Sequence, residues 1–450
     1  MLLCAEYVLP ITADPIEAGA VLVRNGKIAD IGAAAVLRAR YPEEEIRDFG
    51  QAAILPGFVN VHTHLEYTAM RGIVHDVPYA EWLVLVHSKG DTMTPDELES
   101  SAVMGVLEGL SAGITCMADI TPTGAAVKAL QRMGMRGVIY REVNATDKRR
   151  VDFAMNQAKA DIAQWQEYVD SDRLSIGIAP GALYKCHPSI FKKISEFAKD
   201  TIPVAMHVAG SREEYRFIRS GTSAFSVDAL ASSRGYVEIP PWLPTGVTPI
   251  NYALNWDAFE VGNMLAIHCV HVSDDDIAKL REYDIAVGIC SRCNAQLGMG
   301  VAPMREYLKA DLRMGLGTDS PAATDSADML LEMRTGMLVQ RAVERDFFLT
   351  AQTMLELATI GGARALRMDD KIGSLEVGKL ADIIAVDLSG SHQTPTSDPI
   401  SALVNTASST DVIMSMVGGN VLYEQNQWNV DLDVAYNIAR VIEARGRLRS

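Results

Sequence analysis

The chain has 450 residues, of which 48% are hydrophobic and 22% are charged, a composition typical of a well-packed α/β protein rather than a disordered or fibrous one. This length exceeds one ordinary domain and suffices for a parallel α/β barrel with a second, smaller domain. The formal net charge of −16 leaves no basic stripe to neutralise a phosphate backbone, so we expect no nucleic-acid partner.

The start of the chain carries no sign of a targeting segment. Residues 1–15 are largely apolar, but Glu6, Pro10 and Asp14 interrupt them and no basic region precedes them, so they do not read as a signal peptide. Because no apolar run approaches the roughly 18 residues of a membrane helix, we expect no membrane association. Six scattered cysteines do not form a disulfide framework, which predicts a reducing, cytoplasmic location.

Both ends of the chain contain sequence patterns typical of short β-strands. Two β-rich runs flank Asn25-Gly26, which is a strong two-residue hairpin signal. Similar runs return at 380–390 and 411–424, without the helical periodicity of the middle of the chain. We therefore expect one small β-sandwich domain built from both termini, followed by a C-terminal helix. The predicted bounds are 1–55 and 369–430 for the β-sandwich and 431–450 for the helix.

Between these ends, residues 56–368 alternate strand-like runs with helical ones. This alternation is typical of a parallel sheet with right-handed crossovers. Eight strand candidates imply a closed (β/α)8 TIM barrel, and the fold class is therefore α/β. The predicted strands are 58–62, 114–119, 137–143, 174–180, 204–208, 264–269, 285–290 and 314–319.

One connection of the predicted barrel is unusually long. Residues 221–256, between the fifth and sixth strands, contain Pro240-Pro241 and several aromatic residues, among them Trp242 and Trp256. Long loops on such barrels are usually functional. We expect this segment to wall the pocket or to form a subunit contact.

Histidine and aspartate side chains gather at the ends of the predicted strands. Since side chains alternate along a strand, His62 and His64 point the same way from the end of the first strand. His207, His268 and Asp319 end the fifth, sixth and eighth strands. Active sites of such barrels lie at this end, and zinc and iron accept imidazole and carboxylate ligands, so a metal site is predicted. The other histidines are interpreted as structural: His75, His87, His187, His271 and His392.

Four stretches carry more specific patterns: VNVHTHLEYTAMRG, AIHCVHVSDDDI, GLGTDSPAATD and GGARALRMDDKIGSLEVGKLADIIAVD. With them the chain resembles the amidohydrolase superfamily over essentially its whole length, in the hydrolytic deaminase and triazine-hydrolase branch. The stretches SREEYRFIRSGTSAF and SRCNAQLGMGVAPM are most similar to aminodeoxyfutalosine deaminase-like proteins, with adenosine and methylthioadenosine deaminase-like proteins slightly further off.

The resemblance implies a site and an activity. His62, His64, His207 and Asp319 would bind one divalent metal ion per chain, zinc by preference and iron as the alternative. Asp319 would also act in catalysis by accepting a proton from the attacking water, and His268 would stabilise the developing charge. The implied enzyme is a metal-dependent hydrolase of a C–N bond, most simply a deaminase of an exocyclic amine on a nitrogen heterocycle or nucleoside-like compound.

Two positions depart from the family pattern. Gly210 stands where these deaminases carry an acid/base glutamate, and Gly181 stands where they carry a substrate-contacting histidine. Two glycines opposite the metal would enlarge the pocket. Glu213 or Glu214 could reach back from the following helix, although as helical residues they fit a solvated face better. The alternatives that stay open are hydrolysis of another bond, such as a ring amide or carbon–halogen bond, and an idle protein that binds metal and ligand.

Further residues are candidates for substrate binding. Glu66, Arg71, Trp82 and Arg141 fall on loops or strand ends that would face the pocket, and Asn294 is close to a family position near the seventh strand. Each also has a structural interpretation. The expected partner is a small-molecule substrate, and a homodimer is a further expectation because dimers are common in the family.

Overall fold

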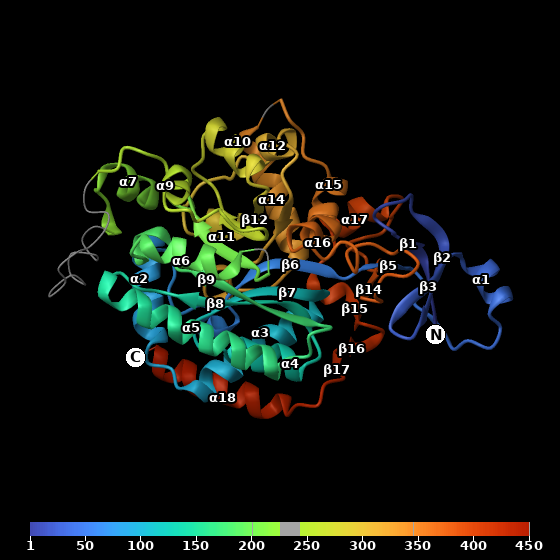
Figure 1. The fold of residues 1–450 in the computed structure, drawn as a ribbon. Coiled ribbons are helices and arrows are strands. Elements are labelled where there is room, and N and C mark those ends of the chain that lie inside the picture. Colours follow the sequence, from blue (N-terminus) through green and yellow to red (C-terminus); the bar gives the residue numbers. More distant parts are fainter. Residues whose placement is uncertain (200, 226–243, 345, 450) are drawn as a thin grey trace.

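The computed structural model describes residues 1–450 except 200, 226–243, 345 and 450. The described residues form two sheets, a parallel barrel and a mixed sheet beside it that contains strands from both ends of the chain (Figure 1). The predicted α/β fold with a (β/α)8 barrel and a small β domain formed from both chain termini is confirmed. In the described residues the predicted β-sandwich takes the form of one nine-stranded mixed sheet.

The barrel consists of eight parallel strands in chain order. They match the eight predicted strands to within a few residues. The last strand returns to the first, where the backbone amide of Asp319 donates to the carbonyl of His62 at 3.0 Å. The strands are β6 Phe58–Thr63, β7 Ile114–Thr121, β8 Arg136–Val143, β9 Leu174–Pro180, β10 Val204–Val208, β11 Met264–His268, β12 Ala286–Ile289 and β13 Met314–Leu316.

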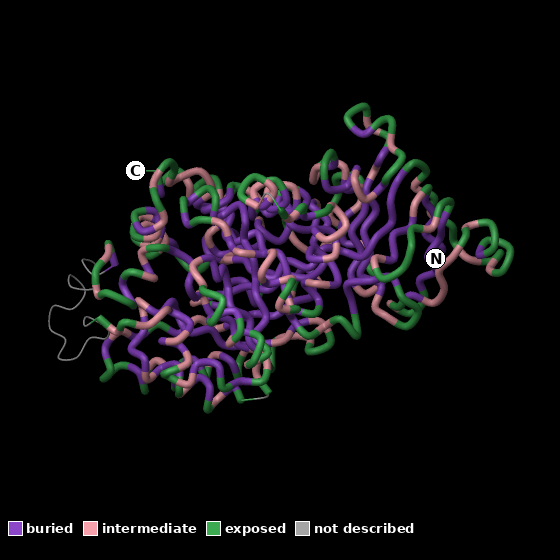
Figure 2. Tube along the Cα trace, turned by 90° about the horizontal axis from the view of Figure 1, so that it is seen from above, coloured by how far each residue is buried: buried purple, intermediate pink, exposed green. Residues whose placement is uncertain are grey.

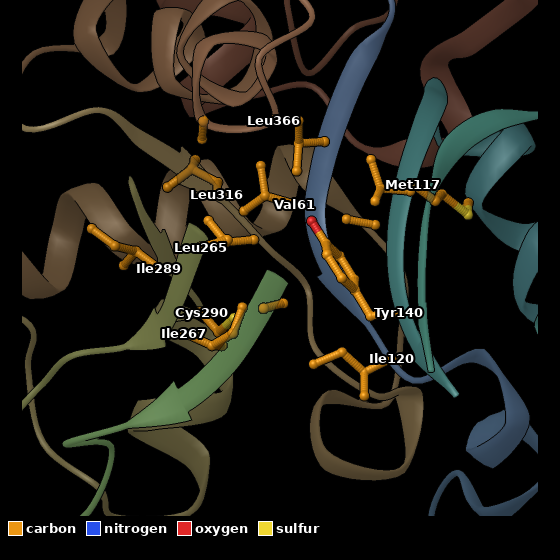
Figure 3. Close-up of a cluster of buried hydrophobic side chains, with 14 of the residues drawn as sticks. Val61, Met117, Ile120, Tyr140, Leu265, Ile267, Ile289, Cys290, Leu316 and Leu366 are labelled. Atoms are coloured by element: carbon orange, nitrogen blue, oxygen red, sulfur yellow. The ribbon is translucent and has the colours of Figure 1, made fainter. Parts of the chain in front are cut away.

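Apolar side chains from opposite strands fill the barrel. Val61, Leu265, Ile289 and Leu316 meet in its interior (Figure 3) and are all at most 1% exposed. Such burial of branched apolar side chains is what makes the interior a packed core rather than a pore. Gly315 permits a close approach here, since a Cβ atom at this position would lie 2.5 Å from a methyl carbon of Val61.

Helices cover the outside of the barrel, and their ends follow local sequence signals. In α3, for example, Thr94 and Glu97 form a capping box, Pro95 opens the helix and Gly113 follows its end with φ +83°. The helices up to the sixth strand are α1 Ala34–Arg40, α2 Tyr79–Gly90, α3 Pro95–Ser111, α4 Ala125–Arg132, α5 Lys148–Tyr168, α6 Ser189–Ala198, α7 Arg212–Ser220 and α9 Pro249–Asn255, with 3-10 helices η1 Leu65–Met70 and η2 Leu183–Lys185.

The later helices run from α10 to the C-terminal helix. They are α10 Asp274–Glu282, α11 Ser291–Gln296, α12 Met304–Lys309, α13 Pro321–Thr324, α14 Met329–Val343, α15 Ala351–Glu356, the π-helix η3 Leu357–Gly361, α16 Gly362–Ala365, α17 Pro399–Asn405, the 3-10 helix η4 Ser409–Asp411 and α18 Val434–Leu448. Helix α18 packs along α3 on the outside of the barrel (Figure 1). None of the helices in the described part of the chain has the length and apolar character needed to span a bilayer.

The second sheet joins the two ends of the chain. The Asn25-Gly26 hairpin connects β2 to β3 as predicted, and β5 pairs antiparallel with β14 from the C-terminal part. The buried backbone runs without a break from this sheet into the barrel (Figure 2). Its strands are β1 Leu2–Val8, β2 Ile16–Arg24, β3 Lys27–Ala33, β4 Ile46–Asp48, β5 Ala52–Pro56, β14 Ile383–Asp387, β15 Val412–Val417, β16 Asn420–Glu424 and β17 Gln427–Trp428.

The long connection after the fifth barrel strand is described only at its two ends. Phe225 stacks on Tyr184 with ring centroids 3.9 Å apart, and Tyr184 lies beside the strand ends of the barrel. The expected wall or subunit contact was assigned to residues 221–256, of which 226–243 lie outside the described residues.

Candidate metal and active site

Three imidazole rings converge at one end of the barrel. The Nε2 atom of His207 lies 3.2 Å from that of His62 and 3.3 Å from that of His64. The carboxylate of Asp319 is next to them, with Oδ1 3.6 Å from His62 Nε2, and Oδ2 lies 3.7 Å from His268 Nε2. The five side chains predicted from the strand ends are therefore brought together, in two groups that share His62.

The chemistry of this donor set fits a divalent cation. Burial and the neighbouring histidines hold the pKa values of His62 and His207 well below the ordinary range, so both rings are neutral. Neutral rings whose lone pairs converge repel one another unless a proton or a cation lies between them. Neutral imidazole nitrogens with one carboxylate are the ligands that zinc prefers.

Hydrogen bonds to the outer ring nitrogens orient two of these histidines. His64 Nδ1 donates to the carbonyl of Ile120 at 3.0 Å, and His268 Nδ1 lies 2.9 Å from Asn294 Oδ1, which accepts. Each bond places the ring proton on Nδ1 and turns Nε2 toward the centre of the cluster. Such outer contacts fix the tautomer and direction of metal-binding imidazoles.

Backbone geometry also sets Asp319 and His268 apart. Both residues have positive φ, +58° for Asp319 and +73° for His268, a region that non-glycine residues rarely adopt. The Asp319 carboxylate is fixed by the backbone amide of Ser320 at 2.6 Å and by the side chain of Cys293. Strained backbone at the ends of two strands, held by local bonds, is typical of functional positions.

A cleft opens next to these ligands. Its wall includes four of the five cluster residues together with aromatic and charged side chains from α2, β8 and the segment after β9. The lining residues are His64, Tyr67, Tyr79, Trp82, Leu83, Val86, His87, Glu142, Ala182, Tyr184, Lys185, His207, His268, Asp319 and Ser320.

Two of the predicted substrate-binding residues are near this cleft. Trp82 lines it, and its indole N–H donates to the carbonyl of Ala322 at 3.3 Å, which fixes the ring. Asn294 lies behind His268 and is 1% exposed. Its observed contact is therefore with a histidine of the cluster, and it orients that ring.

Three other predicted substrate-binding residues are engaged elsewhere, and none is among the described residues that line the cleft. Glu66 is buried and accepts from Thr121, and burial and the nearby Asp119 raise its pKa to about 8. Arg71 pairs with Glu108 beside α18. Arg141 pairs with Asp161 of α5 at 2.8 Å. These carboxylate partners lie on the outer helices, so they hold both guanidinium groups away from the cleft.

The two glycines do not enlarge the cleft as expected. A Cβ atom on Gly181 would lie 1.8 Å from Asn144 Oδ1, so the Asn144 side chain already occupies that space. A Cβ atom on Gly210 would lie 3.2 Å from both His268 Cδ2 and Met299 Cε. The neighbours have closed in on both glycines, and the departures from the family pattern are compensated by packing.

Glu214 does not lie on a solvated face. It is 3% exposed, and its Oε2 accepts from the backbone amide of Gly210 at 2.9 Å, while Oε1 has no partner in the described part of the chain. Ser211 caps the start of α7, where its hydroxyl accepts from the backbone amide of Glu214. Burial raises the pKa of Glu214 to about 7 despite the backbone hydrogen bonds.

Three of the lining residues with acidic or basic side chains were not predicted to face the pocket. His87 was interpreted as structural, and Lys185 was not assigned to the pocket. Glu142 follows Arg141 directly on β8, so the two side chains point to opposite faces of the strand, and it is Glu142 that faces the cleft. The alternation along β8 was the available signal, but it did not say which of the two residues points inward.

Comparisons with known proteins agree with this geometry. Residues 53–422 match the amidohydrolase family, and residues 19–43 match the bacterial imidazolonepropionase-like composite domain. The chain is 28% identical to a 5-methylthioadenosine/S-adenosylhomocysteine deaminase of Moorella thermoacetica, over 93% of each chain. It is 30% identical to the enzyme of that name from Symbiobacterium thermophilum, over 98% of this chain and 97% of the other. Among solved structures, an adenosine deaminase from Xanthomonas campestris with bound zinc superposes with a TM-score of 0.86 at 26% identity, covering 100% of this chain and 98% of the other.

Proposed function

Because the chain belongs to the amidohydrolase family, we propose that it removes an exocyclic amino group from a nitrogen heterocycle by hydrolysis, with release of ammonia. The reaction consumes one water, replaces the C–N bond by a C–O bond and leaves an oxo group on the ring. The convergence of three neutral imidazole nitrogens with the Asp319 carboxylate is the observation that carries this proposal. Relatives named as deaminases of 5-methylthioadenosine and S-adenosylhomocysteine, and a similar structure named as an adenosine deaminase, support the reaction type.

We assign the binding of one divalent ion, zinc by preference, to His62, His64, His207 and Asp319. When bound, such an ion supplies a water activated for attack at neutral pH. Asp319 accepts a proton from the attacking water and can return it to the departing amino group. Its carboxylate is suited to this role because the Ser320 amide and Cys293 hold it in place between His62 and His268.

His268 faces Asp319, with its Nε2 atom 3.7 Å from the Oδ2 atom of that carboxylate. Burial lowers the pKa of its ring, so the neutral form with the proton on Nδ1 presents the Nε2 lone pair to Asp319. His268 can therefore accept a hydrogen bond from a water or amino group held beside the carboxylate. A cytoplasmic location fits the six cysteines, which are all unpaired, and a homodimer stays a prediction.

Elemental analysis of purified protein, followed by ammonia release from the same preparation, tests the proposal. The panel comprises aminopurines, aminopterins, aminopyrimidines and aminotriazines, with 5-methylthioadenosine included because the relatives are named for it. About one zinc per chain and ammonia from at least one amine are expected. One zinc without ammonia from any amine contradicts deamination, and halide or a ring-opened product would then identify a different scissile bond.

A further inference from the structure

Two oppositely charged side chains on the wall of the cleft, next to the histidine cluster, have no part in the proposed reaction. Glu142 is the penultimate residue of β8, and Lys185 ends the short helix η2 after β9. Both are half-buried and line the cleft together with His64 and His207. Half-buried charges on the wall of a ligand cleft point to a ligand that completes their hydrogen bonding.

Lys185 keeps unused hydrogen-bonding capacity. Its Nζ lies 2.7 Å from His87 Nε2 on α2. Burial and the adjacent Lys185 lower the pKa of His87 to about 4, so this ring is neutral and accepts from the ammonium group. An ammonium group has three N–H donors, and His87 is the one hydrogen-bond acceptor that the described chain offers it.

The carboxylate of Glu142 does not accept a hydrogen bond from Lys185 in the described part of the chain. No nitrogen–oxygen contact within 4.0 Å joins Glu142 to Lys185 among the described residues. Burial would raise the pKa of Glu142, but Lys185 and the nearby histidines outweigh it and hold the pKa below the ordinary value. The two groups are therefore near enough to stabilise each other's charge and too far apart to close an ion pair.

Glu142 and Lys185 lie near position 181, one of the two glycines that depart from the family pattern. Position 181, at the end of β9, is glycine, and Asn144 fills its space from the segment after β8 and interacts with the Glu142 carboxylate. Position 210 is also glycine, so the pattern's usual acidic side chain there is absent. The Glu142 carboxylate is thus linked, through Asn144, to the space that a side chain at position 181 would fill.

We propose that Glu142 and Lys185 form a subsite that orients the heterocycle, and that the ligand presents an N–H donor to Glu142 and a carbonyl or ring-nitrogen acceptor to Lys185. An ionised carboxylate only accepts hydrogen bonds and an ammonium group only donates them. If the reacting amino group is held at the histidine cluster, the ring edge that satisfies both side chains is the lactam edge of guanine- and pterin-type rings. The ring atoms of adenine offer acceptors but no lactam N–H. The inferred class of substrate rests on the proposed deamination, whereas the existence of the subsite does not depend on it.

Binding of hypoxanthine and purine to the zinc-loaded protein tests the subsite without turnover. The two probes share the fused ring, and neither carries the amino group, but only hypoxanthine has the lactam N–H and carbonyl. By equilibrium dialysis, hypoxanthine should bind about 10-fold or more tightly than purine, the effect of charge-assisted hydrogen bonds. Lys185→Met and Glu142→Gln should each remove most of this preference with zinc content unchanged.

Lys128→Met and Glu99→Gln, which alter an exposed ion pair far from the cleft, are the matched controls and should keep the preference. Absence of hypoxanthine binding, equal binding of the two probes to the unaltered protein, or a preference that survives in both cleft variants overturns the subsite. A clear preference for hypoxanthine with no ammonia from any amine would overturn the deamination and leave the subsite standing.

Discussion

The carboxylate of Glu214 accepts a hydrogen bond from the backbone amide of Gly210, at 2.9 Å, so the position that lacks the family's acidic side chain is contacted by an acidic side chain four residues later. Ser211 begins α7 with its hydroxyl accepting from the Glu214 amide, which fixes this turn. Glu214 lies behind the backbone of the loop and is not among the lining residues of the cleft. It therefore supports the loop that carries Gly210.

The raised pKa of Glu214 predicts a pH dependence of stability. The folded pKa of about 7 exceeds the ordinary 4.5, so the folded protein binds the proton more tightly than the unfolded chain does. This contribution is complete below pH 4.5 and is lost as the pH rises through 7, by at most about 3 kcal/mol. Urea unfolding of the zinc-loaded protein between pH 5 and 8 should show this fall. Glu214→Gln should flatten it, and Glu213→Gln, one residue away, should not; equal slopes in both variants contradict the assignment.

Replacement of Gly210 by alanine should disturb His268. The added methyl group would lie about 3.2 Å from the ring of His268 and from Met299 Cε, a distance at which one of them must move. Overpacking of this kind costs roughly 1–3 kcal/mol, and here the displaced ring is part of the site. Ammonia release should therefore fall together with the melting temperature. Gly32→Ala is the control, because no atom lies within 4 Å of a Cβ there; an unchanged rate in Gly210→Ala would show that His268 tolerates the contact.

Loss of His207 should abolish metal retention. Its Nε2 lies within 3.3 Å of the Nε2 atoms of His62 and His64, so His207→Ala removes the ligand shared by both neighbours. Zinc measured by elemental analysis after dialysis should drop from about one per chain to near zero. His87→Ala, a histidine of the same cleft outside the cluster, should keep its zinc. Full zinc occupancy in His207→Ala would remove His207 from the metal site.

Replacement of Asn294 should lower the rate of ammonia release without lowering the zinc content. Asn294→Ala leaves the buried Nδ1–H of His268 without its acceptor and frees the ring to rotate. Loss of such an orienting partner costs about 10- to 100-fold in activity at comparable sites. Ammonia release should fall by about that factor while zinc content stays near one per chain. Asn405→Ala, an exposed asparagine of α17, should leave the rate unchanged, and an equally active Asn294→Ala would assign no orienting role to this residue.

The strands and the ligand cluster were predictable because both depend on order along the chain. Apolar runs such as Phe58–Thr63 become barrel strands, and residues that end such strands, such as His207 and Asp319, must share one rim. The substrate side was not predictable in the same way. The choice between Arg141 and Glu142 depends on how β8 is rotated about its axis, and Asp161 on α5, 20 residues later, holds Arg141 outside.

Glu214 illustrates a second limit. A helical residue at the first turn of α7 would face solvent or core depending on the angle at which the helix leaves the strand. That angle follows from the Ser211 cap and from the packing of α7 against η2 and α9, which no local pattern encodes. The sequence could name the carboxylate but not its direction.

One residue, Gly57, separates β5 of the terminal sheet from β6, the strand that carries His62. On one side, β5 pairs with β14. The first residue pair between these two strands, Ile383 with Pro56, joins positions more than 300 residues apart. During synthesis on the ribosome, one edge of β5 therefore stays unpaired until residues 383–387 have emerged. The neighbour of β6, the strand that carries His62, is therefore fully paired only when nearly the whole protein has been made. A nascent chain that stalls after the barrel would leave this edge unpaired, and an unpaired strand edge is open to pairing with other chains.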